Sequence, residues 1–178
     1  IVKAPDWAYI AKINVAREEV KRSYTPNVQG DIPVVVMEFL SDAEGTEYSS
    51  KRTYPPGKWF YYEQILQVPN YIIFEPESGT LEVHCLDESG YDLRTSDENN
   101  RYWLNEMQLF IGVWQGRREN REGYWLRWLD QAGNLLLWGT ELVVQEREAK
   151  EKEREAKETA LKRLEELEQR LRDAGIEP

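Results

Sequence analysis

One carboxylate set inside an apolar segment is the residue of this sequence with the clearest chemical potential. Residues 32–41 read I-P-V-V-V-M-E-F-L-S, so Glu38 is surrounded by valine, methionine, phenylalanine and leucine. A nearly continuous apolar run of this length predicts a β-strand that is covered on both faces. Burying a carboxylate is costly unless it is paired with a cation, hydrogen-bonded or bound to a metal. We therefore expect a compensating partner for Glu38 close to this strand.

Asp6 is the second acid suited to chemistry, because it follows Pro5 and opens a strand predicted at residues 7–13. If that strand pairs with residues 32–40, Asp6 and Glu38 converge on one hard cation, and oxygen ligands of this kind suit Mg²⁺ or Mn²⁺. Such an ion polarises a phosphate oxygen and lowers the pKa of a bound water, as phosphodiester hydrolysis requires. A lysine nearby would position the water and stabilise the developing charge. Taken alone, Asp6 also fits an ordinary strand-edge acid.

Several other kinds of catalysis are excluded by composition. The 178 residues include one histidine, His84, and one cysteine, Cys85. A zinc site built from His and Cys therefore lacks the necessary residues, and a Ser-His relay would have to use His84, which is predicted to be structural because it lies inside a hairpin strand. The sequence contains neither a G-x-G-x-x-G nor a Walker motif. A single cysteine allows no intrachain disulfide and fits a reducing, cytoplasmic location.

The elements that must position these acids are strands and one short helix. Residues 58–68 predict a helix after the P-P-G turn at 55–57, and residues 70–74 and 80–86 predict a hairpin. Further short strands are predicted at residues 102–104, 109–114, 123–129 and 134–138. The basic residues of the segment 116–121 could contact phosphate, but its acids offset their charge and a solvated loop is the favoured interpretation. The sequence thus predicts an α/β (α+β) fold with a mixed central sheet, a β-rich aromatic second half and a helical tail.

The tail begins where the composition changes sharply, near Val144. We predict one domain over residues 1–144 and a charged helix over 145–178, ended by Gly175. This tail is either a solvated helix with i,i+4 ion pairs, or a short coiled coil or docking helix, through which copies of the chain could associate. Because the sequence starts at Ile1 within a strand-like segment, we expect a further element before it. An a/d spacing of 4, 3, 4 and 3 links the apolar residues Ala160, Leu164, Leu167, Leu171 and Ala174.

Several segments also occur in a distinctive order. Pro5-Asp6 is followed by P-V-V-V-M-E-F-L-S, then a lysine-containing segment, a helix, and Y-I-I-F-E-P-E-S-G-T-L-E-V. This order resembles the bacterial putative restriction endonuclease family (Uma-two type) of the PD-(D/E)XK nuclease superfamily. The whole chain looks similar to it, including residues 54–69, the aromatic segment 114–138 and the charged helix. The resemblance implies a restriction-endonuclease-like sheet and a Mg²⁺- or Mn²⁺-dependent endonuclease whose substrate is nucleic acid, with DNA favoured.

The resemblance implies roles for individual residues as well. Asp6 matches the acid of the PD element and Glu38 matches the acid of the (D/E)XK element, and both are expected to bind the metal. The backbone carbonyl of Phe39, the residue after that acid, is expected to face the same ion. A further acid, from an N-terminal helix, would lie before Ile1.

The sequence departs from the superfamily pattern at the catalytic lysine. Leu40 stands two residues after Glu38, where the pattern has lysine. The lysine is then expected from the following segment, where two candidates remain. Lys51 has the more suitable separation from Glu38, whereas Lys58 fits a K-x-x-x-Y pattern on the predicted helix and ranks slightly ahead.

Charge and composition leave more than one function open. The formal net charge of −10 argues against a broad nucleic-acid-binding surface. Together with the displaced lysine, it favours an alternative in which a catalytically inactive nuclease fold serves binding or assembly. The retained Asp6 and Glu38 favour the metal-dependent endonuclease. A third hypothesis is a small-ligand binder whose tryptophans stack on the ligand. No run of about 18 apolar residues occurs, so no membrane span is predicted.

Overall fold

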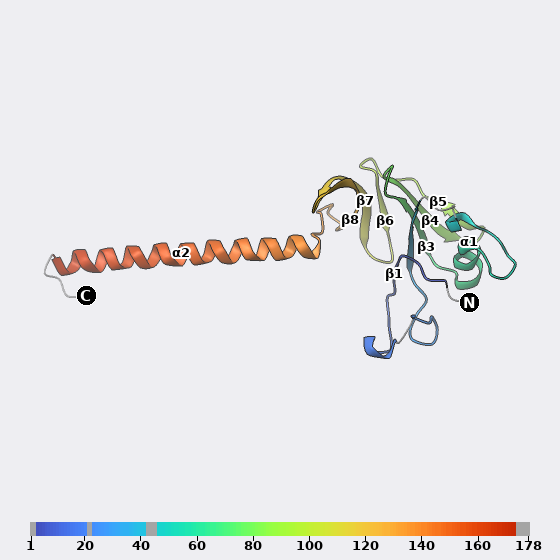
Figure 1. The fold of residues 1–178 in the computed structure, drawn as a ribbon, viewed down its shortest axis with the longest axis horizontal. Coiled ribbons are helices and arrows are strands. Elements are labelled where there is room, and N and C mark those ends of the chain that lie inside the picture. The colour runs from blue at the N-terminus through green and yellow to red at the C-terminus, as the bar shows by residue number, and fades with distance from the viewer. Residues whose placement is uncertain (1–2, 21–22, 42–45, 174–178) are drawn as a thin grey trace. The chain divides into compact units, whose positions relative to one another are not determined.

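The computed structural model describes residues 3–20, 23–41 and 46–173 (Figure 1). The chain divides into two compact units, Ile1–Leu135 and Leu136–Pro178; the sequence-based boundary at residue 144 stays a prediction. The elements of the first unit are β1 (Trp7–Tyr9), η1 (Arg17–Glu19), β2 (Val35–Phe39), η2 (Thr46–Tyr48), α1 (Lys58–Phe60), η3 (Tyr61–Leu66), β3 (Asn70–Glu75), β4 (Thr80–Asp87), β5 (Gly90–Leu93), β6 (Arg101–Leu104), β7 (Leu109–Arg118) and β8 (Arg121–Leu129).

A five-stranded sheet in the order β1-β2-β3-β4-β5 forms the centre of the first unit. Neighbouring strands are antiparallel except β2 and β3, which are parallel and are connected through α1 and η3. Parallel strands need such a crossover, and they are usually covered on both faces. The two strands are accordingly buried over most of their length. The prediction of an α+β fold with a mixed central sheet is confirmed.

One face of this sheet packs against a second, antiparallel sheet of β6, β7 and β8. Side chains alternate between the two faces of a strand, so Val35 and Met37 of β2 point to the same side. There they form a core with Ile72, Leu104 and Ile111, all of which are buried. Burying an aliphatic side chain of this kind stabilises the fold by about 1.5–3 kcal/mol. This apolar core holds β2 on the face of the sheet opposite to Glu38.

The opposite face of the central sheet is covered by the short helical segment α1–η3. Val36, Tyr71 and Ile73 of the sheet form a core there with Tyr62 of η3 and with Val68. Figure 1 shows the central sheet with α1 on one side and β6 to β8 on the other. Glu38 follows Val36 by two residues, so its side chain lies on the face that α1–η3 covers. The fold therefore places the acid under a helix.

Three local expectations were wrong. Residues 134–138 form no strand; within the described chain Leu135 makes an isolated bridge to Leu129, and the helix α2 begins at Gly139. The segment 116–121 is not a free loop, because its arginines continue β7 and β8 and only residues 119–120 make the turn. The strand β5 was not expected, since it is only four residues long and contains Gly90 and Asp92, two residue types that are uncommon in strands.

The second unit contains α2 (Gly139–Asp173), one helix of 35 residues, and so the predicted helical tail is confirmed. No described residue of α2 is buried, and Leu164, Leu167 and Leu171 expose 54%, 53% and 38% of their surface. Ala174 and Gly175, which the sequence placed in the seam and at the helix end, lie outside the described residues. None of the helices in the described ranges is long and apolar enough to cross a membrane.

Candidate functional site

Glu38 is the fourth of the five residues of β2 and has no solvent-exposed surface. It faces Ile73 across the parallel pairing of β2 and β3, and Ile73 in turn faces Glu82 of β4. The preceding β2 residues, Val35, Val36 and Met37, are buried as well. A carboxylate in this position must find its partners among protein groups.

Those partners are Lys58 and Tyr62, both on the helical segment that covers this face. The Lys58 ammonium donates to Oε2 of Glu38 at 3.0 Å, and the Tyr62 hydroxyl donates to Oε1 at 3.1 Å. Residues four apart lie on one side of a helical turn, which is why K-x-x-x-Y brings both groups to the same acid. Each carboxylate oxygen of Glu38 therefore has a donor.

The position of Lys58 depends on how α1 begins. Gly57 precedes α1, and its N–H donates to the carbonyl of Lys51 at 2.8 Å. A side chain at Gly57 would collide with the carbonyl of Ser49, so this close approach of two backbone segments requires glycine. Trp59 then packs the helix against the sheet. The centroid of its ring lies 4.8 Å from the ring centroid of His84 and 5.4 Å from that of Tyr91.

Asp6 stands at the edge of β1, next to the end of β2. Its Oδ2 accepts a hydrogen bond from the Phe39 N–H at 2.8 Å. The pairing of β1 with β2 ends at Trp7 and Met37, so Phe39 lies opposite Pro5. In a strand the N–H and C=O of one residue point to the same side, and proline has no N–H to offer. The Phe39 carbonyl therefore faces the edge that Asp6 occupies, without a donor from Pro5.

Glu47 is a site residue that the sequence did not reveal. Its Oε1 accepts from the Lys58 ammonium at 3.2 Å, so Lys58 lies between two carboxylates. Its carbonyl accepts from the buried Tyr71 hydroxyl at 2.9 Å, which holds η2 against the sheet. Glu47 sits in a 3₁₀ turn with no periodic pattern, so no sequence signal distinguished it from other acids. Tyr62, in contrast, was detectable from its spacing to Lys58.

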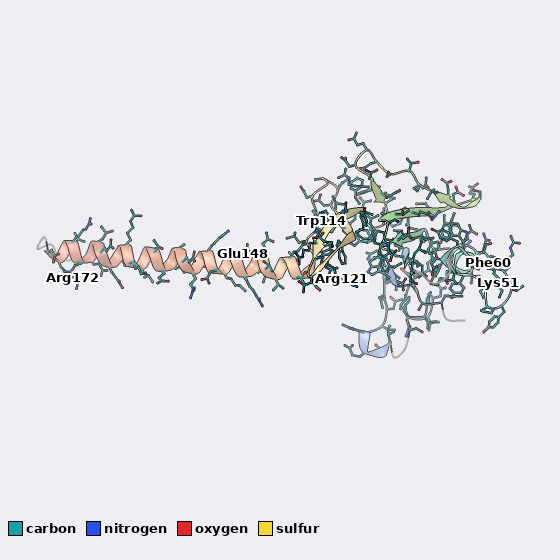
Figure 2. All side chains as sticks on the ribbon, turned by 45° about the horizontal axis from the view of Figure 1, so that its top comes forward. Lys51, Phe60, Trp114, Arg121, Glu148 and Arg172 are labelled. Carbon is teal, nitrogen blue, oxygen red and sulfur yellow. The ribbon has the colours of Figure 1, made fainter. Side chains whose placement is uncertain are left out.

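Lys51, the other lysine considered, is not brought to Glu38. Its side chain is exposed and makes no hydrogen bond or ion pair with another described residue. In Figure 2 Lys51 is labelled at the edge of the first unit, near Phe60. Leu40, which occupies the usual lysine position, packs with Val36 on the same face as Glu38. The ammonium that contacts Glu38 belongs to Lys58 of α1.

Burial dominates the electrostatics of the acid. It raises the pKa of Glu38, and the charge of Asp6 adds to this, while Lys58 and Tyr62 act in the opposite direction. Burial lowers the pKa of the Lys58 ammonium, but hydrogen bonds and charges from Glu38 and Glu47 outweigh it, so the pKa is raised overall. Lys58 therefore stays protonated at neutral pH.

The surroundings of the site are acidic as well. Burial, followed by the carboxylates of Glu82, Glu75 and Glu47, raises the pKa of Tyr48 to about 12. The Tyr48 hydroxyl donates to Glu82 at 3.2 Å, and Glu82 also lies 3.1 Å from the ring nitrogen of His84. His84 is buried and packs on Trp59, as a structural residue would. Several negative charges around one positive group favour an additional cation.

The residues present fit a hard divalent ion, although within the described ranges no three His, Cys, Asp or Glu side chains gather as a metal site. Oδ1 of Asp6 has no hydrogen bond to another described residue, and Oδ2 holds Phe39 in place. Each oxygen of Glu38 accepts one hydrogen bond and retains a second lone pair. Two carboxylates and the Phe39 carbonyl would make an all-oxygen ligand set, completed by water.

Comparison with known proteins gives one family. The family model described as Uma2, putative restriction endonuclease, matches residues 2–115. The matched region includes β1, β2, α1 and η3 and ends within β7, so α2 lies outside it. No curated protein and no solved structure gives a significant match.

Proposed function

Because the chain belongs to the Uma2 family of putative restriction endonucleases, we propose that it is a metal-dependent endonuclease that cleaves phosphodiester bonds in DNA. Family membership supports nuclease chemistry on nucleic acid. The metal, its identity as Mg²⁺ or Mn²⁺, and the choice of DNA are parts of the proposal. The observation that carries it is the meeting of a fully buried acid, an edge acid and an ammonium at one end of β2.

In this proposal the ion would be held by Asp6, Glu38 and the carbonyl of Phe39. When bound, a divalent ion supplies Lewis-acid polarisation of the phosphate and a lowered pKa of the attacking water. Asp6 fixes the end of β2 through the Phe39 N–H, which sets the direction of the Phe39 carbonyl. The three groups thus act as one preorganised set.

Lys58 and Tyr62 would act from the helical side of the site. The side chain of Lys58 is 22% exposed, so its ammonium could contact a phosphate oxygen while it stays close to Glu38. It would orient the attacking water and stabilise the negative charge that develops on the phosphate. Tyr62 is a positioning residue, since its hydroxyl holds Oε1 of Glu38 and has almost no contact with solvent.

A plasmid-cleavage assay with a matched pair of lysine variants tests the proposal. We expect cleavage in Mg²⁺ or Mn²⁺ that is abolished by a chelator, reduced about 100-fold or more in Lys58→Met, and unchanged in Lys51→Met. Glu38→Gln and Asp6→Asn should both lose cleavage, and calorimetry should show that both lose metal binding. Full cleavage by Lys58→Met, or equal heats of Mn²⁺ binding in wild type and Glu38→Gln, would refute this assignment.

A second candidate, an inactive nuclease fold used for binding or assembly, is favoured by one specific observation. Lys58 is paired with Glu38 and Glu47 together, so its charge is already balanced without a phosphate. The net charge of −10 points the same way. In the assay above, this alternative predicts no cleavage in wild type with any divalent ion and no heat from Mn²⁺.

A further inference from the structure

The helix α2 presents an apolar stripe that no described residue of the second unit covers. Its 35 residues include none that is buried, and leucines along its second half are 38–60% exposed. Ion pairs within the helix support it, such as Lys157 with Glu153 at 2.6 Å and Lys162 with Glu158 at 3.3 Å. Exposed pairs of this type contribute little each, and most helices gain their stability from packing an apolar face. The stripe therefore calls for a partner.

The stripe is longer than the leucines alone. Because residues three and four apart lie on one side of a helix, small residues extend it toward the N-terminus. Its spacing repeats after eleven residues, from Ala149 to Ala160 and from Ala160 to Leu171. Glu153 is the one charged residue of this extended stripe. We define this seam as Ala149, Glu153, Ala156, Ala160, Leu164, Leu167 and Leu171. An eleven-residue period is a known coiled-coil repeat, so the seam can pair over six turns of helix.

Charges beside the leucines identify the partner. With Leu164 and Leu171 at a and Leu167 at d, Arg163 takes position g and Glu168 takes position e. In a parallel pair in register, each g residue meets the e residue five positions later on the other helix. Arg163 then faces Glu168 of a second copy, twice by symmetry. An antiparallel pair would instead oppose Arg163 or Arg170 to arginine.

We infer that α2 is a dimerisation element that binds a second copy of this chain as a parallel, in-register coiled coil. The seam supplies the apolar contact, with small residues in the first half and leucines in the second. The Arg163–Glu168 pairs set orientation and register. The helix lies outside the region matched by the family, so association through it is a property that the nuclease family match does not provide. It does not depend on whether the chain cleaves DNA.

Sedimentation equilibrium of the full chain tests both the partner and its orientation. We expect wild type to dimerise and Leu167→Glu to be monomeric while its circular dichroism shows a folded first unit. Arg163→Glu and Glu168→Arg should each raise the dissociation constant about tenfold, since each reversal turns two attractive pairs into repulsive ones. The double variant should return to the wild-type value, because the pairs are restored with exchanged signs.

Arg172→Glu is the matched control, because it makes the same charge change as Arg163→Glu at position b, which faces away from the partner helix. Its dissociation constant should equal that of wild type. A monomeric wild type at every soluble concentration would overturn the inference. Single reversals that leave the dissociation constant unchanged, or a double variant as weak as the singles, would overturn the parallel arrangement.

Discussion

Removing the ammonium of Lys58 should destabilise the fold in a manner that depends on pH. In Lys58→Met the aliphatic stem is kept, but Glu38 is left buried with only the Tyr62 hydroxyl as a donor. Breaking a buried ion pair on one side costs about 3–5 kcal/mol. Glu38 is fully buried and Lys58 is 22% exposed, so the lower end of this range applies. We expect a loss of about 3 kcal/mol at pH 7.

Protonation of Glu38 limits this loss. An unfolded glutamate titrates near pH 4.3, so protonating the buried acid at pH 7 costs at most about 3.7 kcal/mol, and at pH 5.5 about 1.6 kcal/mol. Between those pH values the folded variant binds more protons than the unfolded chain, because burial raises the pKa of Glu38. The stability of Lys58→Met relative to wild type therefore rises as the pH falls.

Urea denaturation at several pH values between 5.5 and 8 measures this effect, with the slope m checked for constancy. Lys51→Met is the control, since Lys51 is exposed and makes no side-chain hydrogen bond or ion pair with another described residue. The control should match wild type throughout. Equal stability of the two lysine variants at pH 7 would refute the reasoning. A difference in the free energy of unfolding between Lys58→Met and wild type that is the same at every pH would also refute it.

Three further predictions concern the same region. Glu38→Gln should raise the free energy of unfolding by about 1 kcal/mol at pH 7 in metal-free buffer, because Lys58 keeps its ion pair with Glu47. This gain should shrink at lower pH, where Glu38 of the wild type becomes protonated. A lower free energy of unfolding in urea denaturation would contradict this prediction. Tyr62→Phe should cost about 1–3 kcal/mol in the same measurement, since a buried acceptor loses its donor. Gly57→Ala should cost about 1–3 kcal/mol in thermal unfolding by its collision with Ser49, and an unchanged Tm would show that the backbone can yield there.

Much of the fold could be predicted because its strands carry clear patterns. The apolar run around Glu38, the hairpin predicted at residues 70–74 and 80–86 and the charged tail each correspond to observed elements. The strand predicted at residues 134–138 was wrong because apolar composition alone does not make a strand. A neighbouring strand with free hydrogen-bonding groups is also needed. The polar edge strand β5 was missed for the converse reason, since its place in the sheet comes from pairing with β4.

The candidate site divides in the same way. Glu38 was found because a charge in an apolar strand violates a local rule, and such violations concentrate at functional sites. Lys58 and Tyr62 could be related by helical spacing, but their spacing alone could not show that Lys58 contacts Glu38 whereas the side chain of Lys51 is exposed. Glu47 reaches the site from a short turn, and nothing in the order of residues encodes the distance from that turn to Lys58.

The buried acid of β2 is a residue that selection for folding stability alone would not favour. Replacing a buried ionised group by a neutral or apolar one often leaves a fold equally stable or more stable. Mutation under selection for folding alone would therefore convert Glu38 to a residue like its neighbours Val36 and Met37. Natural chains have many such stabilising changes within reach and accept them where function is not harmed. A glutamate at this position is therefore better explained by function than by folding stability.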